Sequence, residues 1–205
     1  MTKTHNKSNH GEAQSEVSNL LGITDPAALE RHERAALIAA YDRAAPSYPG
    51  NEPFTSHDVC NLHRLILGNI FEWAGEYRQT DLACKGIKWC QAKFILYEMS
   101  NFRRMLERMT PFSPSLSRQE VLSRLAEIHG ELIVIHPFLD GNGRTARLLC
   151  DLLLMQAEYP PIRLGAFDDQ EIQRDYFAAI HDVWEKIDYQ PLIALLDRLV
   201  AVKPS

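Results

Sequence analysis

The sequence lacks any long hydrophobic run. Although 45% of its 205 residues are hydrophobic, no uninterrupted apolar stretch reaches the about 20 residues that a helix needs to cross a bilayer. Residues 1–18 are polar and contain no hydrophobic segment of the kind that a signal peptide carries. We therefore expect a protein of the cytoplasm with no membrane partner.

Cysteine is scarce, and basic residues are not in excess. No two of the four cysteines form a CxxC pair, so the sequence predicts neither a zinc knuckle nor a disulfide framework, and we expect reduced thiols. The 22 basic and 27 acidic side chains give a net charge of −5. Proteins that bind nucleic acid usually present a basic face. We therefore expect no direct contact with nucleic acid.

One group of residue types that bind metals does occur. His57, Cys60 and His63 follow one another at intervals of three residues within a predicted helix. Such a triplet advances too far around the helix to converge on one ion, and no fourth ligand is evident. Surface and core roles are the expected ones.

The chain divides into a polar tail and one folded unit. Residues 1–18 have almost no apolar side chains to offset the entropy cost of ordering, so we expect them to be disordered or to order only with a partner. Residues 19–205 have the length and hydrophobic content of a single domain.

Seven stretches with apolar residues at helical spacing predict a mainly α fold. The expected helices cover Pro26 to about Ala45, Thr55 to Trp73, Ala92 to Met109, Ser117 to Ile135, the stretch between Gly143 and Pro160, the stretch that Asp168 and Asp169 open, and Tyr189 to Val202. In the first of these, charged residues at 30, 31, 33 and 34 are expected to form a solvated face. Between Tyr77 and Gln91, the Lys85-Gly86 turn signal and the short apolar run from Ile87 predict a small β-hairpin.

The most informative stretch is residues 136–147, HPFLDGNGRTAR, which joins two apolar helical patterns. Residues 141–143, Gly-Asn-Gly, can present consecutive backbone N–H groups as an anion-binding nest at a helix start, where the helix dipole also favours negative charge. Arg144 and Arg147 add two cations at this helix end, where cations are unfavourable. Sequences that break local rules commonly do so at functional sites. This stretch therefore predicts a phosphate site.

Two further side chains supply chemistry. Asp140 offers a carboxylate suited to a Mg²⁺ ion that also takes oxygens from a polyphosphate. His136 is the only side chain of the stretch that titrates near neutral pH and can take a proton from a hydroxyl. The implied reaction is phosphoryl or nucleotidyl transfer.

Each of these residues also has an ordinary alternative role. Asp140 could cap a helix, and Arg147 could pair with Asp151 four residues later. His136 could be a helix-end imidazole with its hydrogen bonds satisfied. The coincidence of all these residues within one short stretch favours the functional reading.

The stretch resembles the signature of the Fic (filamentation induced by cAMP) family, His-x-Phe-x-(Asp/Glu)-Gly-Asn-Gly-Arg-x-x-Arg. Every defined position is matched, by His136, Phe138, Asp140, Gly141, Asn142, Gly143, Arg144 and Arg147. The similarity extends over about residues 22–199 and includes the segment FEWAGEYR at 71–78. The resemblance implies a helical bundle with a β-hairpin flap over the active-site loop.

The resemblance also implies a protein adenylyltransferase, which transfers AMP from ATP to a Tyr, Thr or Ser hydroxyl of a target protein. His136 would be the general base, and Asp140 would hold Mg²⁺ on the phosphates. Residues 141–143 would cradle the phosphates, while Arg144 and Arg147 would neutralise the departing charge.

The flap that the resemblance implies is residues 85–90, whose edge could pair with an extended target segment. Ile87 and Lys88 would contact the target or the nucleotide. Trp89 could join them or serve as a hydrophobic plug. Tyr176 and Trp184 could border the adenine, although their place in an apolar helical stripe favours core packing.

One family feature is absent. Autoinhibited relatives carry a (Ser/Thr)-x-x-x-Glu-(Gly/Asn) motif, whose glutamate pairs with the second arginine of the signature, here Arg147. No glutamate in this chain is followed by glycine or asparagine. The resemblance therefore implies the toxin of a toxin–antitoxin pair, with a separate small antitoxin chain supplying the glutamate. Family analogy suggests a DNA topoisomerase subunit as the target, but no residue encodes that choice.

Two other readings remain open. A Doc-like phosphotransferase would bind the nucleotide reversed and transfer its γ-phosphate, but Doc sequences typically have lysine where this chain has Gly143. A Fic-fold binding module without turnover is the alternative from another class. In such a module His136 and Asp140 would be expendable.

Overall fold

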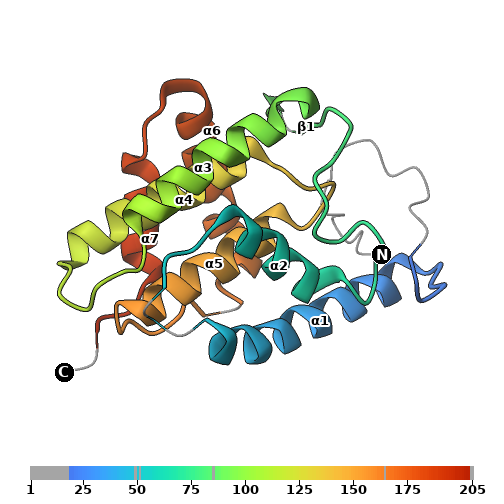
Figure 1. Cartoon of the computed structure of the whole chain (residues 1–205), viewed down its shortest axis with the longest axis horizontal. Coiled ribbons are helices and arrows are strands. Elements are labelled where there is room, and N and C mark those ends of the chain that lie inside the picture. Colours follow the sequence, from blue (N-terminus) through green and yellow to red (C-terminus); the bar gives the residue numbers. More distant parts are fainter. Residues whose placement is uncertain (1–18, 49, 51, 85, 164, 204–205) are drawn as a thin grey trace, which may run out of the picture.

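A computed structural model of the chain describes residues 19–203, except for 49, 51, 85 and 164. The predicted N-terminal tail, residues 1–18, lies outside the described residues. The described part contains seven α-helices and a single two-stranded sheet (Figure 1). The prediction of a mainly α fold with about seven helices and one hairpin is therefore confirmed.

Helix α5 lies at the centre of the bundle, in contact with α1, α2 and α4 (Figure 1). The helices are α1 (Pro26–Ser47), α2 (Ser56–Leu67), α3 (Ile95–Met109), α4 (Arg118–Ile135), α5 (Asn142–Gln156), α6 (Gln170–Lys186) and α7 (Gln190–Leu199). Two short 3-10 turns cover Ala92–Phe94 and Ala166–Asp168. The hairpin pairs β1 (Ala83–Cys84) with β2 (Ile87–Lys88) in antiparallel fashion. No helix among the described residues has the length and apolar character to cross a membrane.

Several helices begin at side-chain caps that the sequence predicts. At the start of α4, the Ser117 hydroxyl accepts from the Glu120 N–H at 3.3 Å, and the Glu120 carboxylate accepts from the Ser117 N–H at 2.8 Å. Thr55 and Asp58 form the same capping box at the start of α2. Each box satisfies N–H groups that the first turn of a helix leaves unpaired. Helix α4, which leads to His136, therefore begins at a fixed residue.

The predicted end of the second helix is wrong. Helix α2 stops at Leu67, and the N–H groups of Ile70 and Phe71 both donate to the Leu67 carbonyl in a turn. Ile70 is 2% exposed and Phe71 6% exposed, so both are core residues. Their apolar spacing arises because the turn is buried against the core. Periodicity alone does not distinguish a buried turn from the continuation of a helix.

Candidate active site

His136 ends α4 in a left-handed backbone conformation, with φ +50° and ψ +59°. Its N–H still donates to the Leu132 carbonyl at 3.0 Å, so the turn is closed. The ring atom Nδ1 lies 3.1 Å from the carbonyl oxygen of Ile133. A carbonyl oxygen can only accept, so Nδ1 carries the proton and Nε2 keeps its lone pair. The fold thus assigns the basic nitrogen of His136 to Nε2.

The imidazole of His136 is neutral at pH 7. Burial lowers its pKa from 6.5 to about 4, the nearby Arg78 lowers it further, and the bond to the Ile133 carbonyl acts in the opposite direction. The charged form is disfavoured because burial removes water that would solvate it. A neutral imidazole is the form that can accept a proton.

The predicted flap contacts this imidazole directly. The Trp89 indole stacks on the His136 ring, with centroids 4.2 Å apart and planes 6° apart. On β2, Ile87 is only 3% exposed, whereas the side chain of Lys88 is exposed. The Lys88 carbonyl accepts from the Trp184 indole N–H of α6 at 3.0 Å. Trp184 therefore fastens the flap to α6, and contact of Ile87 and Lys88 with a ligand stays a prediction.

Arg78 ties the flap to the end of α4. Its Nε donates to the His136 carbonyl at 2.7 Å, and its Nη atoms donate at 2.5 Å to the carbonyls of Thr80 and Cys90. Its backbone N–H donates to the Pro137 carbonyl at 2.9 Å. A cation is also favourable at a helix C-terminus. Sequence reasoning did not assign this role to Arg78. The sequence feature that could have indicated this role is the place of Arg78 in the aromatic-rich segment 71–78, which is similar to the family.

The loop after His136 is closed by Asn142. The Asn142 side chain accepts from the Phe138 N–H and donates to the Phe138 carbonyl, both at 2.8 Å. Asn142 is 2% exposed, and Phe138 is fully buried. The side-chain amide of Asn142 therefore holds the shape of the loop. The backbone N–H of Asn142, at the first position of α5, is the group that can face a phosphate.

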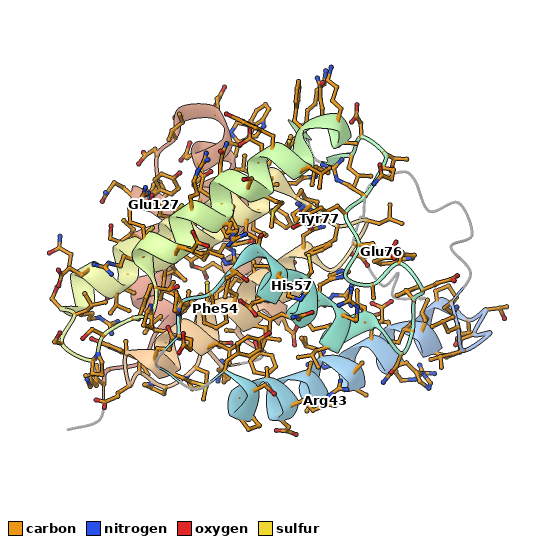
Figure 2. The ribbon with its side chains drawn as sticks, in the orientation of Figure 1. Arg43, Phe54, His57, Glu76, Tyr77 and Glu127 are labelled. Atoms are coloured by element: carbon orange, nitrogen blue, oxygen red, sulfur yellow. The ribbon has the colours of Figure 1, made fainter. Side chains whose placement is uncertain are left out.

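His63 supports the same loop from α2. Its Nδ1 accepts from the Gly75 N–H at 2.7 Å, so its Nε2 carries the proton and donates to the Asp140 carbonyl at 2.9 Å. Its ring stacks on Phe138 with centroids 3.8 Å apart. The expected core role is confirmed for His63. His57 of the same sequence triplet lies exposed on α2 (Figure 2).

Gly141 allows α2 and the loop to approach this closely. Its φ is +78°, a region that favours glycine. A Cβ atom there would lie 2.7 Å from Leu67 Cδ1 and 3.0 Å from His63 Nε2. Gly141 is the N-cap of α5, so the alternative that Asp140 caps the helix is wrong. Asp140 instead accepts from the Gly141 N–H through Oδ1, at 2.6 Å.

Arg144, in the first turn of α5, is held between two carboxylates. Its Nη2 lies 2.9 Å from Asp140 Oδ2, and its Nη1 lies 2.5 Å from Glu33 Oε2 of α1. The side chains of Arg144 and Glu33 are each 17% exposed. The prediction that Glu33 belongs to a solvated face is therefore wrong, because it reaches inward to Arg144. Glu30 and Arg34 are exposed as predicted.

Arg147 lies one turn further along α5, against the loop. A Cβ atom on Gly143 would lie 3.3 Å from Arg147 Nη1, and the guanidinium stands 4.9 Å from the centre of the Phe167 ring. Within the part of the chain that the structure describes, Arg147 has no ion pair. The alternative pair with Asp151 is not formed: Asp151 Oδ2 accepts from the Tyr41 hydroxyl at 2.7 Å, and its Oδ1 accepts from the Ile162 N–H at 2.8 Å.

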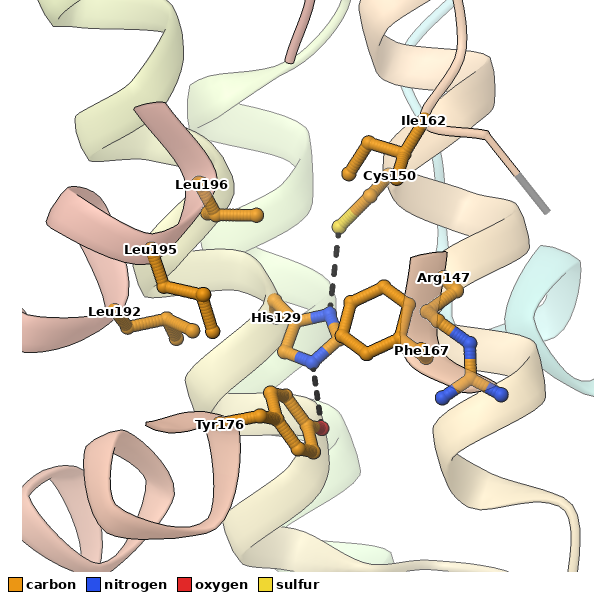
Figure 3. A pocket seen from close by; sticks show the side chains of 9 residues that line it. All are labelled: His129, Arg147, Cys150, Ile162, Phe167, Tyr176, Leu192, Leu195 and Leu196. Carbon is orange, nitrogen blue, oxygen red and sulfur yellow. Dashed lines mark hydrogen bonds between the residues drawn. The ribbon is translucent and has the colours of Figure 1, made fainter. Parts of the chain in front are cut away.

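Behind Arg147 lies a small, mainly apolar pocket (Figure 3). On its wall, His129 Nε2 lies 2.8 Å from the Tyr176 hydroxyl, and Cys150 Sγ lies 3.5 Å from His129 Nδ1. Tyr176 is 9% exposed. The core role of Tyr176, which its helical stripe favoured, is confirmed.

The donor set at the loop fits a hard cation that keeps water ligands. Asp140 offers carboxylate oxygens on a side chain that is 43% exposed, beside the N-terminal amides of α5. The described residues contain no cluster of three or more His, Cys, Asp or Glu side chains able to form a metal cage. Mg²⁺ is usually bound by one or two carboxylates together with substrate phosphates and water. This site suits that mode of binding.

Comparison with known proteins places this geometry in a family. Residues 53–154 match the Fic/DOC family. Protein adenylyltransferase VbhT of Bartonella schoenbuchensis is 33% identical over 142 residues, which cover 69% of this chain and 29% of that protein. Protein adenylyltransferase fic-1 of Caenorhabditis briggsae is 31% identical over 125 residues, which cover 60% of this chain and 23% of the relative. The match thus spans about a quarter of the length of these relatives.

The fold itself is shared over most of the chain. The crystal structure of the BepC effector protein of Bartonella tribocorum, with bound AMPPNP, superposes with a TM-score of 0.71 at 20% identity. The superposition covers 91% of this chain and 92% of that one. The family match over residues 53–154, which contain the whole loop from His136 to Arg147, shows that the chain belongs to the Fic/DOC family.

Proposed function

We propose that this chain is a protein adenylyltransferase that transfers AMP from ATP to a side-chain hydroxyl of another protein. The observation that carries the proposal is the position of a neutral base, Nε2 of His136, at one end of the loop. At the other end are the first amides of α5 with Arg144 and Arg147. The names of the related adenylyltransferases support the same reaction.

Each step uses a group that the fold holds in place. His136 Nε2 takes the proton of the target hydroxyl, and the oxygen attacks the α-phosphorus of ATP. The bond between the α-phosphorus and the bridging oxygen breaks, and pyrophosphate leaves. The α5 amides, Arg144 and Arg147 stabilise the negative charge. Asp140 would hold Mg²⁺, which, when bound, neutralises phosphate charge.

The test is transfer of label from ATP to protein in a host lysate, followed by the intact mass of the labelled target. We expect an added AMP group with the wild type and a loss of about 10²–10⁴-fold in rate with His136→Ala. His57→Ala is the matched control, because His57 is exposed on α2. Equal labelling by wild type and His136→Ala would refute the proposal.

The same mass measurement separates the two other readings. A Doc-like enzyme would add a phosphate group, and a binding module would add nothing. Residue 143 is glycine in this chain, whereas Doc sequences typically have lysine at that position of the loop, so the Doc-like reading gains no support here. The loop chemistry that orients the phosphates therefore favours AMP transfer.

We also propose that the enzyme is the toxin of a pair and is inhibited by a separate small antitoxin chain. Arg147 supports this, because it has no ion pair within the described residues and can receive a glutamate from another chain. The sequence contains no internal glutamate in the required motif. Expression of the wild type should halt growth, and expression of His136→Ala should not. Purified protein that is inactive without any co-purified partner would contradict inhibition in trans.

A further inference from the structure

Glu33 occupies an unusual position for an acidic residue on an outer helix. Glutamate is almost never buried unless it is paired. Glu33 is 17% exposed on its side chain and lies 2.5 Å from Arg144. Helix α1 packs against both α2 and α5, so Glu33 is anchored independently of the loop.

Asp140 has two tasks that conflict. Its Oδ1 accepts from the Gly141 N–H at 2.6 Å, and its Oδ2 lies 2.9 Å from Arg144 Nη2. In the proposed reaction the same carboxylate would hold a divalent cation. A cation and a guanidinium compete for the lone pairs of one carboxylate, since both are positive. Binding of the cation therefore weakens the hold of Asp140 on Arg144.

We infer that Glu33 is a positioning residue that keeps the Arg144 guanidinium at the loop when Asp140 turns to the divalent cation. The inference rests on the proposed function, because it assumes a nucleotide site that depends on magnesium. With Glu33 present, Arg144 keeps a carboxylate partner from α1 throughout. Without Glu33, Asp140 is the only carboxylate partner of Arg144 among the described residues, and the cation must draw Asp140 away from that guanidinium.

This role predicts two effects of Glu33→Gln. The magnesium concentration that half-saturates nucleotide binding should rise on the order of tenfold, the effect of losing one charge-assisted hydrogen bond. Nucleotide affinity without magnesium should stay equal or increase, because the site becomes one unit more positive. A purely structural role for Glu33 would lower both affinities together.

The experiment is calorimetric titration of the full chain with α,β-methylene ATP, whose α–β link cannot be cleaved. Titrations run over a series of magnesium concentrations and in EDTA, for wild type, Glu33→Gln and Glu30→Gln. Glu30 is the matched control, because it is an exposed glutamate on the same helix. The thermal unfolding midpoint without metal shows that each variant is folded. If Glu33→Gln does not fold, Glu33→Asp takes its place. Its shorter side chain weakens the contact with Arg144 while the charge is kept, so a raised magnesium requirement with unchanged affinity in EDTA is then the expected result.

A raised magnesium requirement in Glu33→Gln, with Glu30→Gln unchanged, supports the inference. An unchanged magnesium requirement overturns it, as does a fall of affinity in EDTA that matches the fall in magnesium. Failure of the proposed function would give a different experimental result. A wild type that binds the analogue with magnesium but labels no protein contradicts adenylyl transfer, and the Glu33 comparison still stands.

Discussion

The indole of Trp89 and the imidazole of His136 lie face to face, with centroids 4.2 Å apart and planes 6° apart. Trp89 follows β2 of the flap, and His136 ends α4, so the stack links the flap to the base. The indole keeps water from one face of the imidazole. Burial is the main reason that the pKa of His136 is about 4. Trp89 therefore does more than fill space as a hydrophobic plug, because its contact with the imidazole helps to set the protonation state of His136.

Replacing Trp89 should move the acid side of the pH profile. Trp89→Ala admits water to the imidazole, so the pKa of His136 should rise from about 4 toward 6.5. The base then becomes protonated at higher pH, and kcat/KM should begin to fall near pH 6.5 instead of below pH 5. The pH dependence of AMP transfer measures this shift. Trp89→Phe should keep most of the shielding. Tyr97→Ala, at an exposed aromatic, should leave the profile unchanged.

Gly141→Ala should destabilise the fold more than an ordinary glycine substitution does. The added Cβ meets Leu67 Cδ1 at 2.7 Å, and the φ of +78° is itself unfavourable for alanine. We expect a loss of about 2–4 kcal/mol in the free energy of unfolding, from strain and overpacking together. Urea unfolding measures it.

Gly22→Ala is the matched control. Gly22 has a similar φ of +65°, but a Cβ there meets nothing within 4 Å. Its cost should be limited to backbone strain, about 1 kcal/mol. Equal losses at the two positions would show that the contact with Leu67 and His63 has no energetic effect.

Local signals made the fold and much of the site predictable from sequence. The capping boxes at Thr55 and Ser117 were legible, since each depends on residues only three apart. The loop from His136 to Arg147 was predictable for the same reason: its glycines and arginines are close in sequence. Chemistry that is contained in one short stretch can be read without coordinates.

The partners that support the loop were not predictable. Glu33 is 111 residues from Arg144, and Arg78 is 58 residues from His136. A charged residue on a helix or in a loop has an exposed role by default, and only packing of α1 on α5 brings Glu33 inward. His63 was considered as a metal ligand because spacing shows residue types but not their hydrogen-bond partners.

Arg78→Lys should impair catalysis although the charge is kept. A lysine ammonium cannot span carbonyls of His136, Thr80 and Cys90, which the planar guanidinium reaches together. We expect a loss of about 2–4 kcal/mol in stability, because buried acceptors lose their donor. The flap should also loosen, so kcat should fall more than nucleotide affinity does. Arg103→Lys is the control, because Arg103 lies in an exposed ion pair with Glu107. It should change the free energy of unfolding by no more than about 0.5 kcal/mol and leave kcat unchanged.

Three histidines predict how stability depends on pH. Burial lowers the pKa of His63 and of His136 to about 4 and that of His129 to about 3. The unfolded chain binds these protons near pH 6.5, whereas the folded protein binds them only well below that. Stability is therefore fully present above pH 6.5 and is lost as pH falls. Asp151 acts in the opposite direction, since burial raises its pKa to about 6.

Urea unfolding between pH 7 and pH 4.5 should show a net loss of stability as pH falls. Between pH 6 and pH 4.5 the folded protein carries at most about one extra proton, at Asp151, whereas the unfolded chain carries two to three extra protons at the histidines, so the histidines dominate. The pKa shift of His63 alone should account for a loss of about 2.5 kcal/mol between pH 7 and pH 4.5. His32→Gln, at an exposed histidine, should leave the slope unchanged. His63→Gln should lower stability at pH 7 but flatten the slope. A flat profile for the wild type would mean that these imidazoles are hydrated, and that His136 is not held neutral by burial.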